Sequence, residues 1–309
     1  MRLCLALVLF LSMVGPSLPA SPVKILLDAS TQQPGELVLV TVETEQPSSV
    51  TGAAFDNDVH FFQSGNKPTV WQALVGIDVD VQPGEYPLEL KIVSQAGVET
   101  RETRMLRLSR RAFATRYLTL PEKYVNPPAE VQERIRRETE ELKAIFSTVS
   151  PARLWEGGFR RPLSGKVISS FGKRSVLNGQ PRSLHAGVDL RAPMATALRA
   201  PAGGRVVLVK ELYFAGNCII LDHGLGLYSQ FAHLESFRVK EGQLVRRGEV
   251  IGFTGRSGRV QGPHLHWSVK LSNARIDPMS LLTLLANGTD TIRGPKSISD
   301  SSAGKPAGL

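Results

Sequence analysis

The chain has 309 residues, of which 42% are apolar and 21% are charged, and this composition argues against both a disordered chain and a multi-span membrane protein. Its length is sufficient for two domains with separate cores. The formal net charge of +9 suits an anionic partner. Aromatic residues make up only 6% of the chain and no basic run alternates with them, so nucleic-acid binding is not predicted.

The first twenty residues, MRLCLALVLFLSMVGPSLPA, differ from the rest of the chain. One early positive charge precedes an apolar run, and Gly, Pro and small residues follow it, which is the layout of a cleavable secretory signal. An uncleaved anchor is the alternative, although the run is short for a membrane span. We therefore expect residues 1–20 to be a signal peptide. The mature protein would be exported to the periplasm or cell envelope, with no stable membrane span after cleavage, and Cys218 would be a lone core thiol.

Residues 22–111 are predicted to form a β-sandwich domain, immunoglobulin-like in general architecture. Segments such as ELVLVTVETE and YPLELKIVS alternate apolar and polar residues between turn clusters that contain Pro-Gly. His60 lies beside aromatic residues with no convergent polar partner, so a structural role is predicted for it.

Residues 112–151 are predicted to be a helical linker. The segment AEVQERIRRETEELKAIFS has apolar residues at helical spacing, and Asn126 precedes it as a candidate N-cap. Its dense charge is explained most simply as a solvated face. A regulatory segment lying over an active site is the alternative, and no specific residue supports it.

Residues 152–286 consist of short, glycine-punctuated strands, which predict an antiparallel β-sheet or barrel-like domain and leave no room for a doubly wound α/β fold. The fold class is therefore mainly β. The tail, residues 287–309, has too little apolar content to pack and is predicted to be disordered.

Two short segments of this third region place polar side chains on one face of a strand. In HLHWSVK, residues two apart share a face, so His264 and His266 point the same way while the apolar residues between them face the core. In LHAGVDLRAP the same alternation groups His185 with Asp189, and Gly187 between them leaves space beside the backbone.

These four side chains are candidate metal ligands. Zinc accepts His nitrogen and Asp oxygen, and a catalytic zinc usually has three protein ligands and a position for water, so four candidates are one too many. His233, on a strand end or loop, is a further possible member of the site. His223, in LDHGLG, looks like a turn residue instead. Each pair alone is as compatible with structural histidines as with a site.

The segments HAGVDLRAP, FAHL and GPHLHW, in this order within one glycine-rich β-region, resemble the lysostaphin-like, LytM-type zinc metallopeptidases of bacterial cell walls. The resemblance covers roughly residues 160 to 280. It implies one zinc ion per chain, bound by His185, Asp189 and His266. It also implies that His233 and His264 act in catalysis.

The resemblance predicts a zinc metalloendopeptidase that hydrolyses amide bonds in the peptide part of peptidoglycan, with residues 152–286 as the peptidase domain. Family members often have Tyr where this chain has Phe231, so a phenolic donor is missing there. The alternative function is a non-catalytic LytM-like module that binds and activates cell-wall amidases. A complete set of ligands and catalytic histidines favours the enzyme. The sequence predicts neither the bond cleaved nor the oligomeric state.

Overall fold

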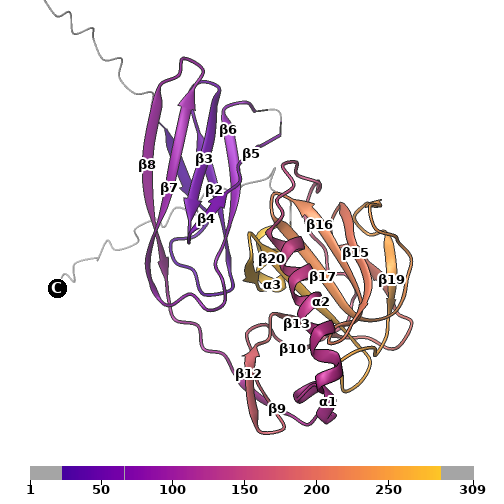
Figure 1. The fold of residues 1–309 in the computed structure, drawn as a ribbon. Coiled ribbons are helices and arrows are strands. Elements are labelled where there is room, and N and C mark those ends of the chain that lie inside the picture. The colour runs from indigo at the N-terminus through magenta and orange to yellow at the C-terminus, as the bar shows by residue number, and fades with distance from the viewer. Residues whose placement is uncertain (1–22, 66, 287–309) are drawn as a thin grey trace, which may run out of the picture.

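A computed structural model of the protein describes residues 23–65 and 67–286 (Figure 1). The predicted signal peptide and the predicted C-terminal tail lie outside these residues. Most of the described secondary structure is β-strand, so the mainly β fold class is confirmed. None of the helices in the described part of the chain has the length and apolar character that crossing a lipid bilayer requires.

The first eight strands form two antiparallel four-stranded sheets, ordered β1-β2-β6-β5 and β4-β3-β7-β8. The strands are β1 Lys24–Leu27, β2 Leu37–Glu43, β3 Ser48–Ala54, β4 Asn57–Val59, β5 Phe62–Gln63, β6 Val70–Gly76, β7 Gly84–Ser94 and β8 Glu99–Leu108. Val38, Val40 and Val42 on β2 share one buried core with Leu88 and Leu90 on β7. Apolar side chains from both sheets therefore fill the space between them, as in the predicted sandwich.

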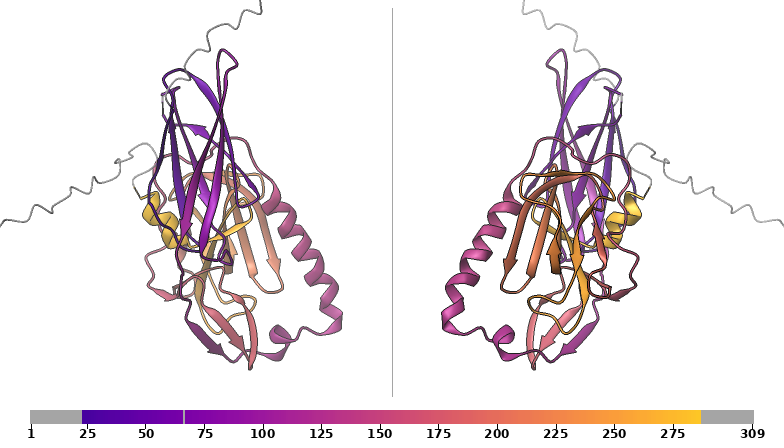
Figure 2. Two further views of the ribbon diagram at one scale, coloured as in Figure 1. Left: turned by 90° about the vertical axis from the view of Figure 1, so that its left-hand side faces the viewer. Right: turned by 90° about the vertical axis from the view of Figure 1, so that its right-hand side faces the viewer.

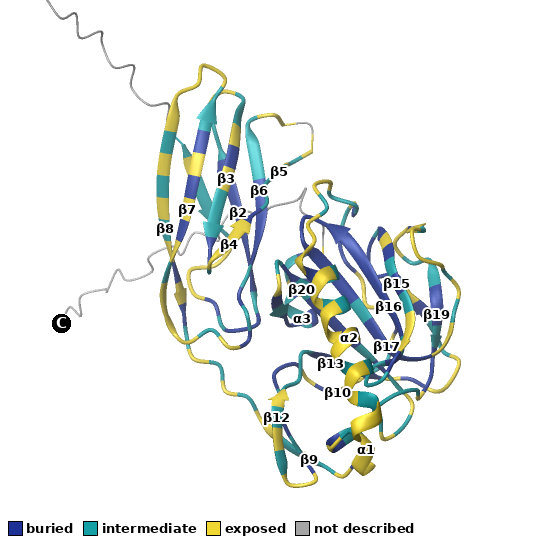
Figure 3. Ribbon diagram, viewed as in Figure 1, coloured by how far each residue is buried: buried dark blue, intermediate teal, exposed yellow. Residues whose placement is uncertain are grey.

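The C-terminal region is built on an antiparallel sheet with the order β10-β13-β20-β17-β16-β15-β18, to which β14, β19 and β21 are attached. The strands are β10 Val167–Ser169, β13 Gly187–Arg191, β14 Ala197–Arg199, β15 Gly204–Leu212, β16 Gly216–Gly224, β17 Leu227–Phe237, β18 Leu244–Val245, β19 Val250–Thr254, β20 His264–Leu271 and β21 Ala274–Ile276. A short helix, α3 (Pro278–Leu284), follows, and Asp277 caps its first turn by accepting a hydrogen bond from Met279 N. Figure 3 shows that β16 and β17 are largely buried, whereas β7 and β8 expose alternate residues.

The segment between the two regions contains more than the predicted helix. It begins with β9 (Thr115–Leu118), which pairs in parallel with β11 (Arg174–Leu177), and β11 pairs with β12 (Gln180–Leu184). A single helical turn, α1 (Glu122–Val125), precedes the main helix α2 (Ala129–Ser147). The prediction that Asn126 caps α2 is wrong, because Pro128 occupies that position and Asn126 ends α1.

Helix α2 packs along one face of the C-terminal sheet, as both views in Figure 2 show. Phe146 packs with Leu208, Ile220 and Tyr228 in a small core of its own, and Cys218 is buried in the same core, as predicted. Burial raises the pKa of the Cys218 thiol to about 12. This thiol is therefore a small core side chain and not a nucleophile.

The sandwich docks against the C-terminal sheet. Leu37, Leu39 and Leu74 belong to the same buried core as Leu271 and Ile276. At the edge of this contact Arg275 forms hydrogen bonds to both carboxylate oxygens of Asp78, at 2.5 and 2.9 Å, and Arg111 pairs with Asp277 at 2.6 Å. Apolar packing and two arginine–carboxylate pairs thus fix the sandwich beside β21 and α3.

Candidate metal centre

Two neighbouring strands bring the predicted ligands together. β13 pairs with β20 so that Asp189 lies directly opposite His266. Leu265 and Trp267 on β20 are fully buried, and the two histidines face the opposite side, as the alternation predicted. Gly187 is necessary for this pairing, because a Cβ there would lie 2.4 Å from the carbonyl oxygen of Trp267 and 2.9 Å from the His266 ring.

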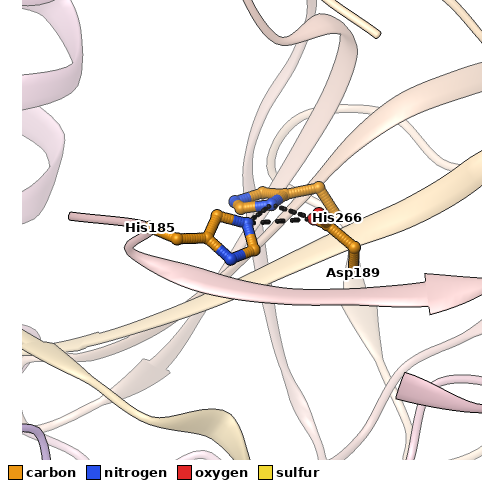
Figure 4. A group of neighbouring side chains, drawn as sticks. All are labelled: His185, Asp189 and His266. Atoms are coloured by element: carbon orange, nitrogen blue, oxygen red, sulfur yellow. Dashed lines mark hydrogen bonds and ion pairs between the residues drawn. The ribbon is translucent and has the colours of Figure 1, made fainter. Parts of the chain in front are cut away.

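His185 completes a compact group of three with Asp189 and His266 (Figure 4). His185 lies just before β13, and its Nε2 is 3.0 Å from Asp189 Oδ1 and 3.0 Å from His266 Nδ1. The third side of the triangle, from His266 Nδ1 to Asp189 Oδ1, is 2.9 Å. His264 Nε2 is farther away, 3.8 Å from Asp189 Oδ1.

This donor set fits a metal ion. Three atoms that carry lone pairs converge, and electron-rich atoms this close together require a cation between them, either a proton or a metal ion. Two imidazole nitrogens and one carboxylate oxygen match the preferences of zinc and leave room for a fourth ligand. The other ring nitrogen of His185, Nδ1, lies 3.1 Å from the carbonyl oxygen of Ser170, which makes it the N–H donor and leaves the lone pair on Nε2.

The other carboxylate oxygen of Asp189, Oδ2, is bound by an arginine that lies outside the segment resembling the peptidase family. Arg116 on β9 places Nη1 3.2 Å from Asp189 Oδ2, and its guanidinium also donates to Ser169 Oγ at 2.6 Å and Ser175 Oγ at 2.9 Å. Burial opposes ionisation of Asp189, but without a metal ion the imidazoles of His185 and His266 can donate hydrogen bonds to Oδ1, and these outweigh burial and hold the pKa of this carboxyl well below its usual range. Asp189 is therefore an anion aimed at the site through Oδ1.

His233 and His264 form a second pair beside this group, with ring centroids 5.0 Å apart. Nδ1 of His233 lies 2.9 Å from Ser257 O, and Nδ1 of His264 lies 2.8 Å from Gly262 O. Each Nδ1 therefore carries the proton, and Nε2 is an acceptor. Burial, followed by the charges of His266 and His264, lowers the pKa of His233 to about 3, so a donor role for its Nε2 would first require protonation.

Strand alternation alone would not direct the side chain of His233 towards His264 and the three candidate ligands. Phe231, two residues earlier on β17, is fully buried in the core, and strict alternation would turn His233 the same way. His233 instead has φ of 65°, in the left-handed region, and its side chain lines the cleft. Because Phe231 does not line the cleft, the aromatic side chain at this position is a core residue here.

The five residues line one cleft of about 690 Å³. Leu118 on β9 and Leu120 just after it contribute to its wall. Between them in sequence, Thr119 O accepts a hydrogen bond from Nε2 of Gln261, another lining residue, at 3.1 Å. The segment beside the site is therefore β9 and not the long helix α2. Neither Arg116 nor β9 was predicted from the sequence; in the structure the residues of β9 alternate between exposed and half-buried, as those of a short strand do.

The remaining histidines are not in the cleft. His60 lies between β4 and β5 in the sandwich. His223 is completely buried at the end of β16 rather than in a turn, and its ring nitrogens contact Gly203 O at 2.7 Å and Ser229 Oγ at 2.9 Å. Burial lowers its pKa to about 4. His223 is therefore a buried strand residue with both ring nitrogens engaged.

Replacing Arg116 with Gln should weaken zinc binding by about 10–100-fold, because Asp189 loses the partner that fixes its orientation. The change keeps a polar side chain of similar reach but removes the charge and the forked geometry. Competition with a chromogenic chelator would measure the zinc affinity. Arg174→Gln, an exposed arginine on the adjacent β11, is the matched control and should bind zinc as the parent does. If Arg116→Gln bound zinc as tightly as Arg174→Gln, this would contradict the proposal that Arg116 positions Asp189.

The part of the chain that contains the three candidate ligands is similar to known proteins. Residues 183–278 match Peptidase family M23. Over 128 residues the chain is 39% identical to the DD-carboxypeptidase/endopeptidase Mpg of Neisseria meningitidis, and over 137 residues it is 36% identical to the peptidoglycan DD-endopeptidase ShyB of Vibrio cholerae. These matches cover 41% and 44% of this chain but only 30% and 27% of the relatives.

A crystal structure of a putative peptidase M23 from Pseudomonas aeruginosa is similar over a much larger part of the chain. The likeness has a TM-score of 0.63 at 30% identity, and it covers 81% of this chain and 94% of that one. The similarity therefore extends beyond the strands that hold the site. On the strength of this match the chain belongs to peptidase family M23.

Proposed function

We propose that the protein is a zinc-dependent endopeptidase that hydrolyses amide bonds in the peptide part of bacterial peptidoglycan. The observation that supports this most strongly is the convergence of His185, Asp189 and His266 within 4.8 Å, in a cleft that two further histidines also line. The names of the relatives, a DD-carboxypeptidase/endopeptidase and a peptidoglycan DD-endopeptidase, agree with the substrate class.

In this proposal His185 Nε2, Asp189 Oδ1 and His266 Nδ1 hold one zinc ion. Zinc, when bound, supplies Lewis acidity that lowers the pKa of a water and polarises the scissile carbonyl. Arg116 keeps Oδ2 of Asp189 occupied, so that Oδ1 is the oxygen presented to the ion. The three ligands leave the open side that catalysis requires.

The two remaining histidines handle protons. His264 Nε2, an acceptor beside Asp189, takes the proton of the attacking water as general base. His233 Nε2 would accept the second proton of the attacking water, and would then donate it to the developing oxyanion or to the leaving amine. Their backbone partners, Ser257 O and Gly262 O, fix which nitrogen of each ring faces the substrate.

A non-catalytic module that activates amidases is the competing function. Such a module needs a surface for its partner but no group of converging ligands, and no pair of oriented acceptors beside it. The cleft has both. We further propose that the mature chain acts on peptidoglycan in the periplasm or cell envelope, with residues 152–286 as its peptidase domain and residues 22–111 as a docked sandwich.

The test is to purify residues 21–309, measure the zinc content, and digest two defined peptidoglycans, one cross-linked through meso-diaminopimelate and one through glycyl bridges. Mass spectrometry of the released muropeptides identifies the bond. About one zinc per chain and a new amine and carboxylate terminus in the products are expected. Unchanged muropeptides from both walls, with zinc present, would favour the non-catalytic module.

A further inference from the structure

The cleft has an excess of positive charge that the proposed zinc site does not use. Four cationic side chains line it, namely Arg116, Lys173, Arg182 and Arg259, and the only carboxylate among its lining residues is Asp189. Asp189 is already engaged by Arg116 and two histidines. No carboxylate of the cleft wall is therefore left to balance Arg182 and Arg259.

Arg259 is half-buried in the loop between β19 and β20. Its guanidinium stacks on an aromatic ring and not on a carboxylate. Its guanidinium lies 4.7 Å from the centroid of the Phe214 ring, and its backbone N–H donates to Phe214 O at 2.8 Å. Within the described residues it has no ion pair with Asp or Glu. Burial, and then the nearby charges of Arg182 and Arg116, lower its pKa, yet a guanidinium remains charged at any physiological pH.

Arg182 approaches the same cleft from β12 and is held by neutral oxygens. Its Nη2 donates to Val125 O at 2.6 Å and to Gln180 Oε1 at 2.7 Å. The remaining guanidinium nitrogens have no carboxylate partner in the described part of the chain. Both arginines are thus oriented by neutral groups before any ligand arrives, and both keep donors for an anion.

We propose that Arg182 and Arg259 form a subsite that binds a free carboxylate of the substrate peptide beside the scissile bond. The inference rests on the proposed function and narrows it, because peptides with free side-chain carboxylates would be preferred. Cross-links through meso-diaminopimelate have such groups, whereas glycyl bridges have none. A guanidinium is planar and can donate two parallel hydrogen bonds to a carboxylate, and neither arginine has a carboxylate partner already. Binding a carboxylate would also reduce the repulsion between the two positive charges.

Binding is measured separately from hydrolysis. Two fluorescent cross-linked peptides are prepared, one with free meso-diaminopimelate carboxylates and one with these groups amidated, and their Kd values are measured by anisotropy on full-length mature His264→Ala protein. The free carboxylate should bind about tenfold or more tightly, as expected for a charge-assisted hydrogen bond. Arg259→Gln or Arg182→Gln should reduce this ratio towards one.

Arg238→Gln is the matched control, because Arg238 also stacks on a phenylalanine, Phe253 at 5.1 Å, but does not line the cleft. It should leave the Kd ratio unchanged. Equal Kd values for the two peptides on the parent, or an unchanged ratio in folded Arg259→Gln and Arg182→Gln, would overturn the subsite. A large Kd ratio combined with intact muropeptides in the digestion would support the subsite and refute the hydrolase instead.

Discussion

Replacing His266 with alanine should abolish both stable zinc binding and hydrolysis of peptidoglycan. His266 Nδ1 is 2.9 Å from Asp189 Oδ1 and 3.0 Å from His185 Nε2, so its removal leaves two ligand atoms where three converge. Two ligands hold zinc weakly, and the loss of affinity should exceed the roughly 10–100-fold that removal of a residue orienting a ligand costs. Zinc content after dialysis and muropeptide release measure the two effects.

The matched control for this variant is His60→Ala, which removes an imidazole from the sandwich and not from the cleft. It should retain about one zinc per chain and parental activity. Thermal unfolding of both variants in excess chelator shows whether His266→Ala is still folded. Full hydrolytic activity in a zinc-free, folded His266→Ala protein would refute the proposed metal chemistry.

The sequence predicted the β20 strand of the site because the two faces of that strand differ so sharply. Leu265, Trp267 and Val269 could only face a core, and this fixed the direction of His264 and His266 by alternation. The same pattern predicted Asp189, whose neighbours Val188 and Leu190 are fully buried. Alternation could not distinguish a ligand from its neighbour, and the distances from Asp189 Oδ1 now separate them: 2.9 Å to His266 and 3.8 Å to His264.

Other parts of the site depend on long-range pairing that local patterns do not encode. Arg116 and Asp189 are 73 residues apart in sequence, and Arg116 reaches Asp189 because β9 pairs in parallel with β11. The side chain of His233 reaches the cleft through a left-handed backbone conformation, which its sequence neighbours do not predict. A lone arginine and a lone histidine in sequence thus become site residues through tertiary structure.

The docked sandwich is a further consequence of tertiary structure. Leu37 and Leu39 looked like ordinary strand residues of one domain, yet they pack with Leu271 and Ile276 of the other. Arg111, at the end of the sandwich segment, pairs with Asp277 and so fixes the chain shortly before β9 begins. Docking therefore places the start of β9, and with it Arg116, close to the site. This arrangement connects the sandwich to the geometry of the candidate metal centre.

Replacing His264 with alanine should separate metal binding from catalysis. His264 shares a strand face with His266 but is 3.8 Å from Asp189 Oδ1, outside the group of three. The variant should therefore retain about one zinc per chain. Its kcat should fall by about 10²–10⁴-fold, the usual contribution of a positioned general base, while KM changes little. Zinc content and the hydrolysis rate of a defined cross-linked peptide are the two measurements.

The informative comparison is between His264→Ala and His266→Ala, which remove the same side chain from positions two residues apart on one strand. If His264 is the general base, His264→Ala should retain zinc and lose turnover, whereas His266→Ala should lose both. Zinc lost from His264→Ala but retained by His266→Ala would reverse the two assignments. Zinc retained by both, with turnover lost in both, would mean that His185 and Asp189 recruit a different third ligand. Because the two variants remove the same side chain from the same strand, a difference between them reflects the different positions of the two rings relative to Asp189 Oδ1 and His185.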